Sequence, residues 1–415
     1  MTRALRSIGS LLLAALLTGA CSESGSSDLA PANELTIAVN APSSVSPFIG
    51  QTIARGVTLA IQEINERGGI TIGEKSFTLR MERFDNELSP QKALQNVRAA
   101  VSEEMIAIVD EGTGVEASWQ LAARANVPIG IVYQGGEDLV DVETRPNVFR
   151  VAPTDHGIAF RLAEYLVPKG LKIAFLHDDS QYGRQGKVAF DDAFGHTPEA
   201  VVFDTSVPSG SGDVAPQVLE ARRSGATALL VWATPSSVAE IVRATRSSGW
   251  DVPLYSAPSA QDPLVRQQLS DHPEWVDGLV FASGRMVAEK GPGPFMAFKR
   301  KYEDAFGVDE VGVTTSEGET VVQPPEYPMY SYDFVKVLAA AIEAARATSG
   351  PAVLDALNQV DVQGANGDER GFNELNHEGV VDDDVYFARF EDMVFVPVED
   401  DPLSSTLEPI DQTVE

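Results

Sequence analysis

The stretch 105–133, MIAIVDEGTGVEASWQLAARANVPIGIVY, contains two short apolar runs separated by a segment with helical spacing. The two runs, 105–109 and 127–133, are rich in Ile and Val, as buried strands are. Parallel strands need a crossover of about a dozen residues, which the helical segment supplies. The stretch therefore predicts a parallel βαβ unit, in which helices cover both faces of the sheet.

The same alternation of strand and helix runs through most of the chain. A first series ends and a second begins near residues 148–155. The expected strands are 35–40, 76–85, 105–109, 127–133 and 147–153 in the first series, and 172–177, 200–204, 226–233, 252–257 and 277–283 in the second. Two such series predict an α/β fold with two Rossmann-like lobes, each built on a parallel central sheet.

The N-terminus has the features of an export signal. A short basic start precedes the apolar segment 8–20, which is too short to span a bilayer and ends in small residues. Cys21, the only cysteine of the chain, follows directly, and the LTGA before it resembles the lipobox of bacterial lipoproteins. We expect a signal peptide over 1–20, a lipid on Cys21 and a flexible tether over 21–34. An ordinary signal peptide with an incidental cysteine is the alternative.

The composition argues against several classes of function. The chain has 31 Lys and Arg against 61 Asp and Glu, and nucleic acid as a partner would need a basic surface instead. The five histidines lack metal-ligand spacing, and neither a G-x-S-x-G elbow nor a phosphate-binding loop is present. Asp382, Asp383 and Asp384 are consecutive acids of the kind that is usually solvated. We expect no metal and no enzymatic activity.

The turn after the strand 105–109 also has the glycine spacing of a dinucleotide-binding motif, with Gly112 and Gly114 in place and two acids about twenty residues later. Three features argue against a nicotinamide cofactor. The strand is the third of its lobe rather than the first, Glu116 within the turn would repel a pyrophosphate, and an exported protein has no supply of the cofactor. We therefore expect no cofactor.

Ligands of open parallel sheets bind beyond the carboxyl ends of the strands, near the N-termini of the following helices. In this chain the turns at those positions are rich in hydroxyls, amides and glycines, with a few carboxylates. They are 43–49, 113–118 and 134–136 in the first lobe, and 177–183, 233–237 and 257–262 in the second. Such side chains suit the binding of a small polar molecule in a cleft between the lobes.

Several segments, taken in order, resemble one family of binding proteins. They are GVTLAIQEINERGGI (56–70), DNELSPQKALQNVRAAV (85–101), NVFRVAPTDHGIAFRLAEYL (147–166), KIAFLHDDSQYGRQG (172–186) and YSYDFVKVLAAAIEAA (330–345). Together they resemble the branched-chain amino acid and amide group of the periplasmic solute-binding proteins of ABC transporters. The resemblance extends from residue 35 to about residue 398 and implies the type I two-lobe fold.

In that fold three crossings between the lobes form a hinge, and the resemblance places them near residues 152, 283 and 380. The expected division follows from these positions. The N-terminal lobe would comprise 35–152 and 284–380, the C-terminal lobe 153–283 and 381–400, and 401–415 would form a disordered acidic tail.

The resemblance also implies roles for individual residues. Tyr182 matches a tyrosine that helps to hold the amino group of the ligand. The turn after the strand 105–109 would offer a serine hydroxyl and backbone amides to a ligand carboxylate, and Glu116 stands near the place of that serine, with Ser118 two residues later. The other candidates are Thr113, Gln134, Gly135 (where the family has a threonine), Thr234, and Ser259 and Asp262 near the place of an acid for the ammonium group.

Glu116 bears on the class of ligand. In the cleft it would repel an α-carboxylate and favour a cationic, amide or polyol ligand. Pointing to solvent at the N-terminus of its helix, it would be a favourably placed surface charge without a bearing on the ligand. Both orientations stay open at this point.

The sequence thus predicts a monomeric, lipid-anchored extracytoplasmic protein that captures an amino acid or a related amide and delivers it to an ABC permease. A sensor that presents its ligand to a membrane receptor is the first alternative, and an extracytoplasmic enzyme is the second, less favoured one.

Overall fold

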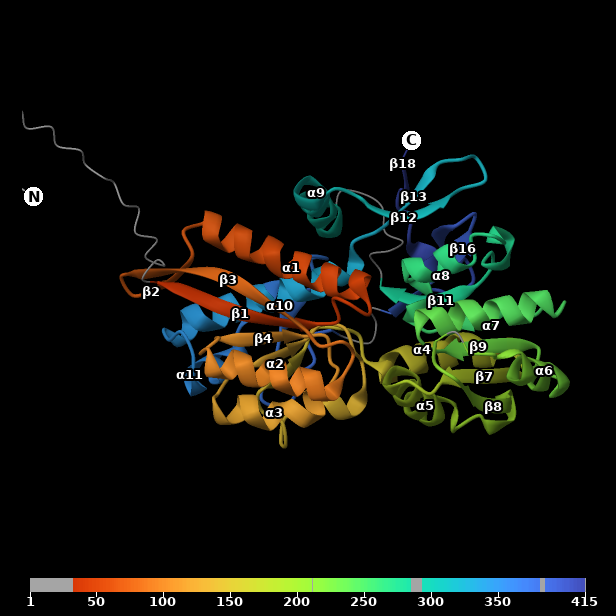
Figure 1. The fold of residues 1–415 in the computed structure, drawn as a ribbon, viewed down its shortest axis with the longest axis horizontal. Coiled ribbons are helices and arrows are strands. Elements are labelled where there is room, and N and C mark those ends of the chain that lie inside the picture. Colours follow the sequence, from red (N-terminus) through yellow and green to blue (C-terminus); the bar gives the residue numbers. More distant parts are fainter. Residues whose placement is uncertain (1–32, 211, 285–292, 381–384, 415) are drawn as a thin grey trace, which may run out of the picture. The chain divides into compact units, whose positions relative to one another are not determined.

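The structure, a computed structural model, describes residues 33–210, 212–284, 293–380 and 385–414 (Figure 1). The predicted signal peptide, Cys21 and nearly all of the tether lie outside the described residues, as do Asp382, Asp383 and Asp384. Within the described part of the chain, no helix is both long and apolar enough to cross a bilayer.

The first lobe is built on a six-stranded sheet of order β2-β3-β1-β4-β5-β6. Its strands are β1 (Glu34–Ala41), β2 (Ile70–Ile72), β3 (Lys75–Asp85), β4 (Ala107–Asp110), β5 (Ile129–Ile131) and β6 (Val148–Arg150). All pairings are parallel except that of the short β2 with β3. The strand order reverses between β1 and β4, so the turns after these two strands lie next to each other at the carboxyl edge of the sheet.

Helices cover both faces of this sheet (Figure 1). One face carries α1 (Pro47–Glu66), α9 (Pro294–Phe306), α10 (Glu326–Ala345) and α11 (Pro351–Leu357), and the other carries α2 (Pro90–Ser102) and α3 (Val115–Arg124). α1 packs along α10 at Gly56 so closely that a Cβ at this position would overlap the carbonyl oxygen of Pro328. This close packing places the N-terminal end of α10 beside the middle of α1.

The second lobe repeats the plan with a seven-stranded sheet of order β17-β16-β11-β10-β9-β7-β8. Its strands are β7 (Ile173–Asp178), β8 (Val201–Val207), β9 (Ala228–Trp232), β10 (Leu254–Ser256), β11 (Val280–Gly284), β16 (Val385–Glu391) and β17 (Val394–Pro397). β7 to β11 are parallel, and the terminal hairpin of β16 and β17 adds two antiparallel strands at one edge. The strand order reverses between β7 and β9.

The helices of the second lobe also form two layers. α4 (Asp155–Leu166) and α5 (Gln181–Phe194) cover one face, and α6 (Ala215–Arg223), α7 (Pro235–Ser247) and α8 (Pro263–Gln268) cover the other. Aromatic stacking joins the first layer to the sheet, with the rings of Phe175 and Phe190 3.8 Å apart. The predicted class, an α/β fold with parallel-dominated sheets in two lobes, is therefore confirmed.

The hairpin of β12 (Asp309–Thr314) and β13 (Thr320–Gln323) departs from the predicted division of the chain. The sequence analysis assigned 284–380 to the first lobe, but Val311 and Val321 are buried in the core of the second. Gln267 of α8 also donates a hydrogen bond of 2.7 Å from Nε2 to the Val311 carbonyl. The chain therefore makes two additional passages between the cores, on either side of this hairpin. The small hairpin of β14 (Asp361–Gln363) and β15 (Glu369–Gly371) lies against α10 of the first lobe.

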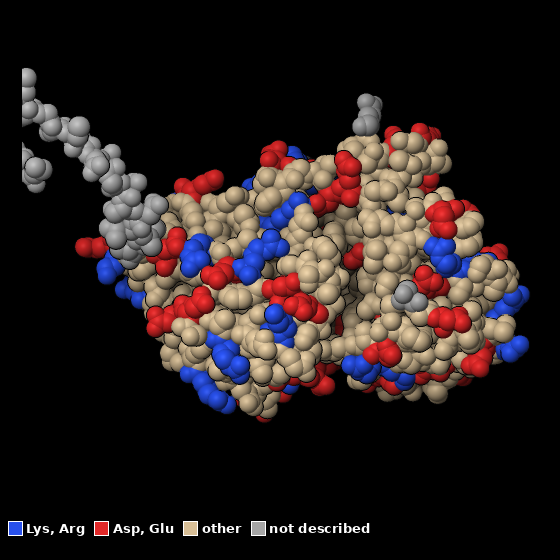
Figure 2. All heavy atoms as spheres, viewed as in Figure 1, with Lys and Arg blue, Asp and Glu red and all other residues tan. Residues whose placement is uncertain are grey.

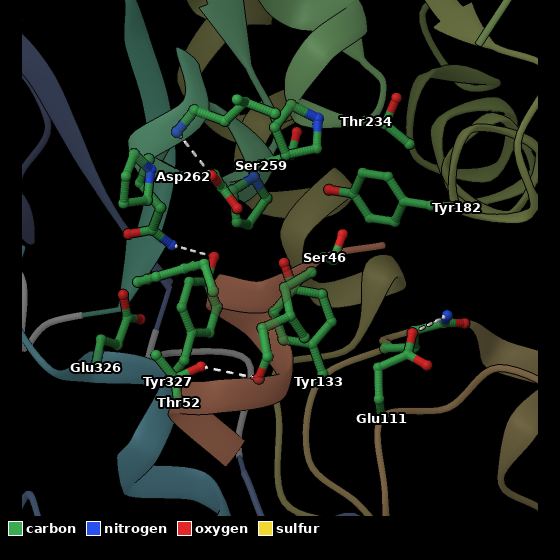
Figure 3. A pocket seen from close by; sticks show the side chains of 18 of the residues that line it. Ser46, Thr52, Glu111, Tyr133, Tyr182, Thr234, Ser259, Asp262, Glu326 and Tyr327 are labelled. Atoms are coloured by element: carbon green, nitrogen blue, oxygen red, sulfur yellow. Dashed lines mark hydrogen bonds between the residues drawn. The ribbon is translucent and has the colours of Figure 1, made fainter. Parts of the chain in front are cut away.

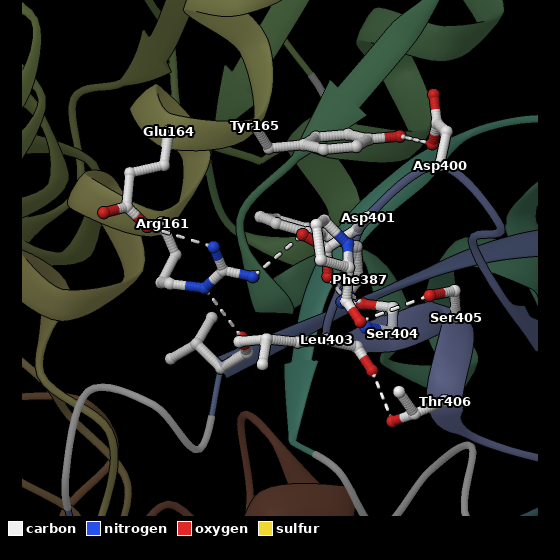
Figure 4. Close-up of polar contacts among 12 residues, drawn as sticks. Arg161, Glu164, Tyr165, Phe387, Asp400, Asp401, Leu403, Ser404, Ser405 and Thr406 are labelled. Atoms are coloured by element: carbon white, nitrogen blue, oxygen red, sulfur yellow. Dashed lines mark hydrogen bonds and ion pairs between the residues drawn. The ribbon is translucent and has the colours of Figure 1, made fainter.

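The C-terminal segment is ordered, so the prediction of a disordered tail from residue 401 is wrong (Figure 4). Asp401 is 2% exposed and accepts hydrogen bonds from Ser404 N and Oγ at 2.8 and 2.6 Å. Arg161 of α4 forms an ion pair with the same carboxylate at 3.0 Å. Beyond it, β18 (Thr413–Val414) pairs with β13. Asp401 is thus held by hydrogen bonds and an ion pair within the fold, and the acidic composition of the segment does not reveal these contacts.

Acidic side chains are spread over the face shown in Figure 2, with basic side chains among them. On this face the acidic side chains are therefore not gathered in one patch.

Candidate functional site

A cavity of about 940 Å³ is lined by residues at the carboxyl edges of both sheets. The turns after β1 and β4 contribute from the first lobe, and the turns after β7 and β9 contribute from the second. These are the places where the strand order of each sheet reverses, which is where open α/β sheets bind ligands. The volume lies within the range of small-molecule sites.

Six of the predicted site residues line this cavity, and three do not. The six are Gln134, Gly135, Tyr182, Thr234, Ser259 and Asp262. The other three, Thr113, Glu116 and Ser118, are not among the lining residues. The structure therefore brings together the predicted residues of four turns but not those at the N-terminal end of α3.

Glu116 has an exposed side chain in the first turn of α3, where the helix dipole favours a negative charge. Ser118, two residues later, is buried, and its Oγ donates to the Gly114 carbonyl at 2.9 Å. The acid that this turn presents to the cavity is instead Glu111, directly after β4. Glu111 replaces Glu116 as the carboxylate whose position bears on the ligand.

Glu111 is 1% exposed and is held by four hydrogen bonds. Its carboxylate accepts from Asn86 Nδ2 at 3.0 Å and from Gln134 Nε2 at 2.6 Å. It also accepts from Thr113 N at 3.2 Å and from Thr113 Oγ1 at 3.1 Å. Burial raises the pKa of Glu111, and these hydrogen bonds oppose that rise. Thr113 thus contributes to the site by fixing Glu111.

The neighbouring Asp110 is completely buried and accepts from Gly112 N at 2.7 Å and from Asn40 Nδ2 at 2.7 Å. Burial raises the pKa of Asp110 to about 7. The donors of the turn between β4 and α3 are consequently directed to carboxylates of the chain itself.

Aromatic side chains form another part of the wall (Figure 3). The rings of Tyr133 and Tyr327 lie 5.0 Å apart, and Phe48 meets Tyr327 edge to face at 6.3 Å. Gln261 Nε2 donates to Tyr327 Oη at 2.7 Å and so orients that ring. Tyr182, at the start of α5, faces the same space. Burial raises the pKa of Tyr182 above its ordinary value, so the phenol is neutral.

The turn after β5 is supported by a buried arginine. Arg150 is 0% exposed, and its Nη1 donates to the carbonyls of Gln134 and Gly136 at 3.3 and 2.8 Å. The guanidinium also binds Glu378 with two hydrogen bonds, one of them 2.7 Å from Nε to Oε2. These bonds fix the backbone of Gln134 and Gly135 at the cavity.

Asp155 begins α4 and lines the cavity with a side chain that is 2% exposed. Burial raises its pKa to about 7, partly offset by the charge of Arg150. Its Oδ2 has no hydrogen-bond partner among the described residues. Such a group is costly to bury in its charged form unless a ligand or solvent supplies the partner.

Two more acids line the cavity near the second sheet. Asp262 caps α8 by accepting from Leu264 N at 2.8 Å, and burial raises its pKa to about 6. Glu326 of α10 accepts from Gly284 N, at the end of β11, at 2.7 Å, and burial raises its pKa to about 7. Glu326 Oε2 has no partner within the described part of the chain.

An ion pair joins α1 to the hairpin of the second lobe. Arg55 of α1 pairs with Asp309 of β12, and the Tyr302 hydroxyl donates to the same carboxylate at 2.8 Å. Asp309 also lines the cavity. The pair therefore connects elements of both cores at the edge of the site.

The charges around the cavity are one-sided. Six acids line it: Glu111, Asp155, Asp262, Asp309, Glu310 and Glu326. Among the described residues that line it there is no Lys, Arg or His. Over the same described residues, there is no group of three or more His, Cys, Asp or Glu placed to hold a metal ion.

The family model for periplasmic binding proteins matches residues 34–393 of this chain. The chain belongs to the periplasmic binding protein family. Membership identifies it as a ligand-binding protein of an extracytoplasmic family and agrees with the position of the cavity between the two sheets.

Individual relatives of this periplasmic binding protein are distant. It is 25% identical over 337 residues to a Leu/Ile/Val-binding protein homolog 7 from Brucella abortus (strain 2308), covering 76% of this chain and 78% of the relative. The fold is similar to a type 1 periplasmic binding protein from Bordetella pertussis Tohama I, with a TM-score of 0.77, 21% identity, and coverage of 88% and 100% of the two chains. It is also similar to an ABC transporter substrate-binding protein from Desulfitobacterium hafniense in complex with Leu, with a TM-score of 0.69, 22% identity, and coverage of 88% and 100%.

Sequence reasoning missed several cavity residues, namely Glu111, Tyr327 and Glu326, whereas Phe48 lies in the turn 43–49 that it had singled out. Glu111 comes two residues after the end of the predicted strand 105–109 and directly after β4, so the rule that ligands bind at strand ends could have found it. Tyr327 and Glu326 carry no such signal, because they begin a long helix far from the other site residues in the sequence.

Proposed function

We propose that this periplasmic binding protein captures a small molecule in the cavity between its two sheets and delivers it to the permease of an ABC transporter. The observation that carries the proposal is the cavity itself, whose walls come from the strand-end turns of both lobes. A ligand there would touch both lobes at once, so binding would favour the arrangement in which they are close together.

In this proposal the ligand contacts include Tyr182, Gln134, Gly135, Ser259 and Asp262, with Glu111 in place of Glu116. Thr234 has a supporting role, because its N and Oγ1 donate to Asp178 at 2.7 and 2.6 Å and thereby shape the turn after β9. We propose binding without catalysis, because the family whose model matches this chain is one of binding proteins.

We further propose that the protein acts as a monomer held to the membrane by a lipid on Cys21. Support comes from the position of this single cysteine after the apolar segment 8–20. Replacing Cys21 with serine should move the protein from the detergent phase to the aqueous phase in a Triton X-114 partition. Partition of the variant into the detergent phase would contradict the lipid anchor.

A ligand screen tests the proposed function. The purified protein should show a rise in melting temperature with a defined small molecule, and mass spectrometry should recover that molecule unchanged after long incubation. Conversion of the molecule into a product would contradict a pure binding function. Delivery is tested by reconstituting the permease in vesicles, where uptake of the ligand should require the binding protein.

A further inference from the structure

We infer that the ligand is a small organic amine, bound as its cation and lacking a carboxylate group, rather than an α-amino acid. This inference rests on the proposed function and specifies the ligand class of the same cavity. Three independent features of the wall support it.

The first feature is that the turn between β4 and α3, where the strand order of the first sheet reverses, is already filled by carboxylates of the chain itself. Backbone N–H groups at the N-terminus of a long helix are the usual site for an anion. In the turn that leads into α3, two backbone N–H groups are already taken, because Gly112 N donates to Asp110 and Thr113 N donates to Glu111. The Thr113 hydroxyl and the Gln134 amide bind Glu111 as well. A ligand carboxylate there would be repelled by Asp110 and Glu111, which already accept from these donors.

The helix ends of the second lobe are occupied in a similar way. Leu264 N of α8 donates to Asp262 at 2.8 Å, and Gly183 N of α5 donates to Ser180 Oγ at 3.0 Å. Thr234 N, before α7, donates to Asp178. The first turn of α1 has no side-chain cap, so it remains the place where an oxygen of the ligand would bind. A comparison of amines with amino acids therefore tests whether a carboxylate is accepted anywhere in the cavity.

The second feature is a pair of buried carboxyl groups, each with one oxygen that lacks a partner among the described residues. Asp155 Oδ2 and Glu326 Oε2 belong to side chains that are 2% and 3% exposed, and neither atom has a hydrogen-bond partner among the described residues. Buried carboxylates are normally paired. An ammonium group carries three donors and one positive charge, so it supplies what these oxygens lack.

The third feature is the aromatic wall. Figure 3 shows Tyr133, Tyr182 and Tyr327 around one space, with Glu111 on one side and Asp262 and Glu326 on the other. Aromatic faces attract cations and also pack against the hydrocarbon part of an amine. Aliphatic side chains, Ile49, Ile158 and Val385, extend this apolar wall.

Cation binding should also release protons. Burial raises the pKa values of Asp155 and Glu326 to about 7 and that of Asp262 to about 6, so these carboxyls are partly protonated near neutral pH when the cavity is empty. A bound ammonium favours their ionised forms. Affinity should therefore be highest above pH 7 and fall as the pH drops toward 6, whereas alkyl amines stay protonated throughout this range.

The other charged groups near these acids do not change the preference of the cavity for a cation over an anion. Arg150 faces Asp155 but is bound to Glu378, and Arg266 faces Asp262 but is bound to Gln323 and to the Met393 carbonyl. The titratable groups that surround the three carboxyls are Glu111, Tyr133, Glu137, Tyr182, Asp309, Glu310, Tyr327 and Tyr330. None of these groups can carry a positive charge, so they do not oppose the binding of a cation.

Matched pairs that differ only in the carboxylate test the inference on the purified protein. Isothermal titration would compare isopentylamine with leucine, agmatine with arginine, and putrescine with ornithine. In at least one pair the amine should bind more than about tenfold tighter, with proton release in buffers of different ionisation enthalpy. An amino acid that binds as tightly as its amine, or binding without proton release, would overturn the inference.

Two near-isosteric variants, Glu326→Gln and Asp155→Asn, should weaken amine binding at least about tenfold. The control Glu116→Gln removes a charge of the same sign on the exposed face of α3 and should leave the affinity unchanged. Melting temperatures distinguish misfolding from loss of binding, and two variants at separate positions guard against one that does not fold. Unchanged amine affinity in both folded variants would overturn the inference.

The outcomes for the two proposals are distinct. If a neutral or anionic small molecule from the wider screen binds in the cavity and none of the amines does, the ligand class is wrong and the binding function stands. If no small molecule of any class binds, the proposed function itself fails.

Discussion

The substitution Arg150→Met tests whether the turn after β5 is held in place by the buried guanidinium. Methionine roughly preserves the length and the apolar stem of arginine but offers no donors. The change leaves Glu378 without its ion-pair partner and leaves the carbonyls of Gln134 and Gly136 without the hydrogen bonds that Arg150 supplies. The expected effects are lower stability and a less fixed turn at the cavity.

The magnitude follows from burial. Breaking a fully buried pair costs about 3–5 kcal/mol. The Glu378 side chain is 22% exposed, so water compensates part of this, and we expect a loss of about 3 kcal/mol. The entropy of unfolding is about 2.1 cal/mol/K per residue, which gives about 0.8 kcal/mol/K for the cooperative unfolding of residues 33–415. The melting temperature should therefore fall by about 4 °C. Unfolding of the first lobe alone would give about twice that shift.

Differential scanning calorimetry measures this effect, with Arg223→Met as the matched control. Arg223 is exposed at the end of α6, where such a change should alter the free energy of unfolding by less than about 0.5 kcal/mol. A melting temperature for Arg150→Met within about 1 °C of the control would refute the argument that this arginine supports the turn.

Three further predictions follow from other contacts. Gly56→Ala should destabilise the protein by about 1–3 kcal/mol in urea denaturation, because the added methyl group overlaps the α10 backbone. Burial would raise the pKa of Glu63, but hydrogen bonds from Tyr332 and Lys301 lower it to about 2. Ionised Glu63 therefore stabilises the fold fully above pH 4.5, and this stabilisation is lost as the pH falls toward 2. In Glu63→Gln the free energy of unfolding should consequently fall less between pH 4.5 and pH 2 than in the unmodified protein. Asp309→Asn should weaken the link to α1 by about 1 kcal/mol, so a bound ligand should dissociate about fivefold faster in stopped-flow fluorescence. An unchanged dissociation rate would show that this ion pair does not help to hold the lobes together around the ligand.

The architecture was predictable from the sequence because its signals are local. Buried strands such as β4 are short apolar runs, and the helices between them have one apolar stripe, so the βαβ order can be read directly. The hairpin of β12 and β13 has no such signal. Its burial in the second core depends on contacts with α8, which lies about fifty residues earlier in the chain.

The site was predictable only as far as the strand ends are. Six predicted residues line the cavity because ligand-binding turns follow parallel strands. Three acids, Asp110, Glu111 and Glu116, lie between the end of β4 and the first turn of α3, and sequence reasoning favoured the exposed one. Acids are rarely fully buried, so the general expectation places Asp110 and Glu111 at the surface. Only the contacts of Asn86, Thr113 and Gln134 reveal why Glu111 is retained inside.

The central claim is that the cavity between the two sheets binds the ligand. It is tested most directly by titrating the ligand found in the screen against Tyr182→Ala, with Glu116→Gln as the control. Tyr182 lines the cavity, whereas Glu116 does not. Truncating a buried aromatic contact costs about 2 kcal/mol, so the affinity of Tyr182→Ala should fall about thirtyfold while that of the control stays the same. Equal affinities for the folded Tyr182→Ala variant and the unmodified protein would place the ligand outside this cavity and contradict the account.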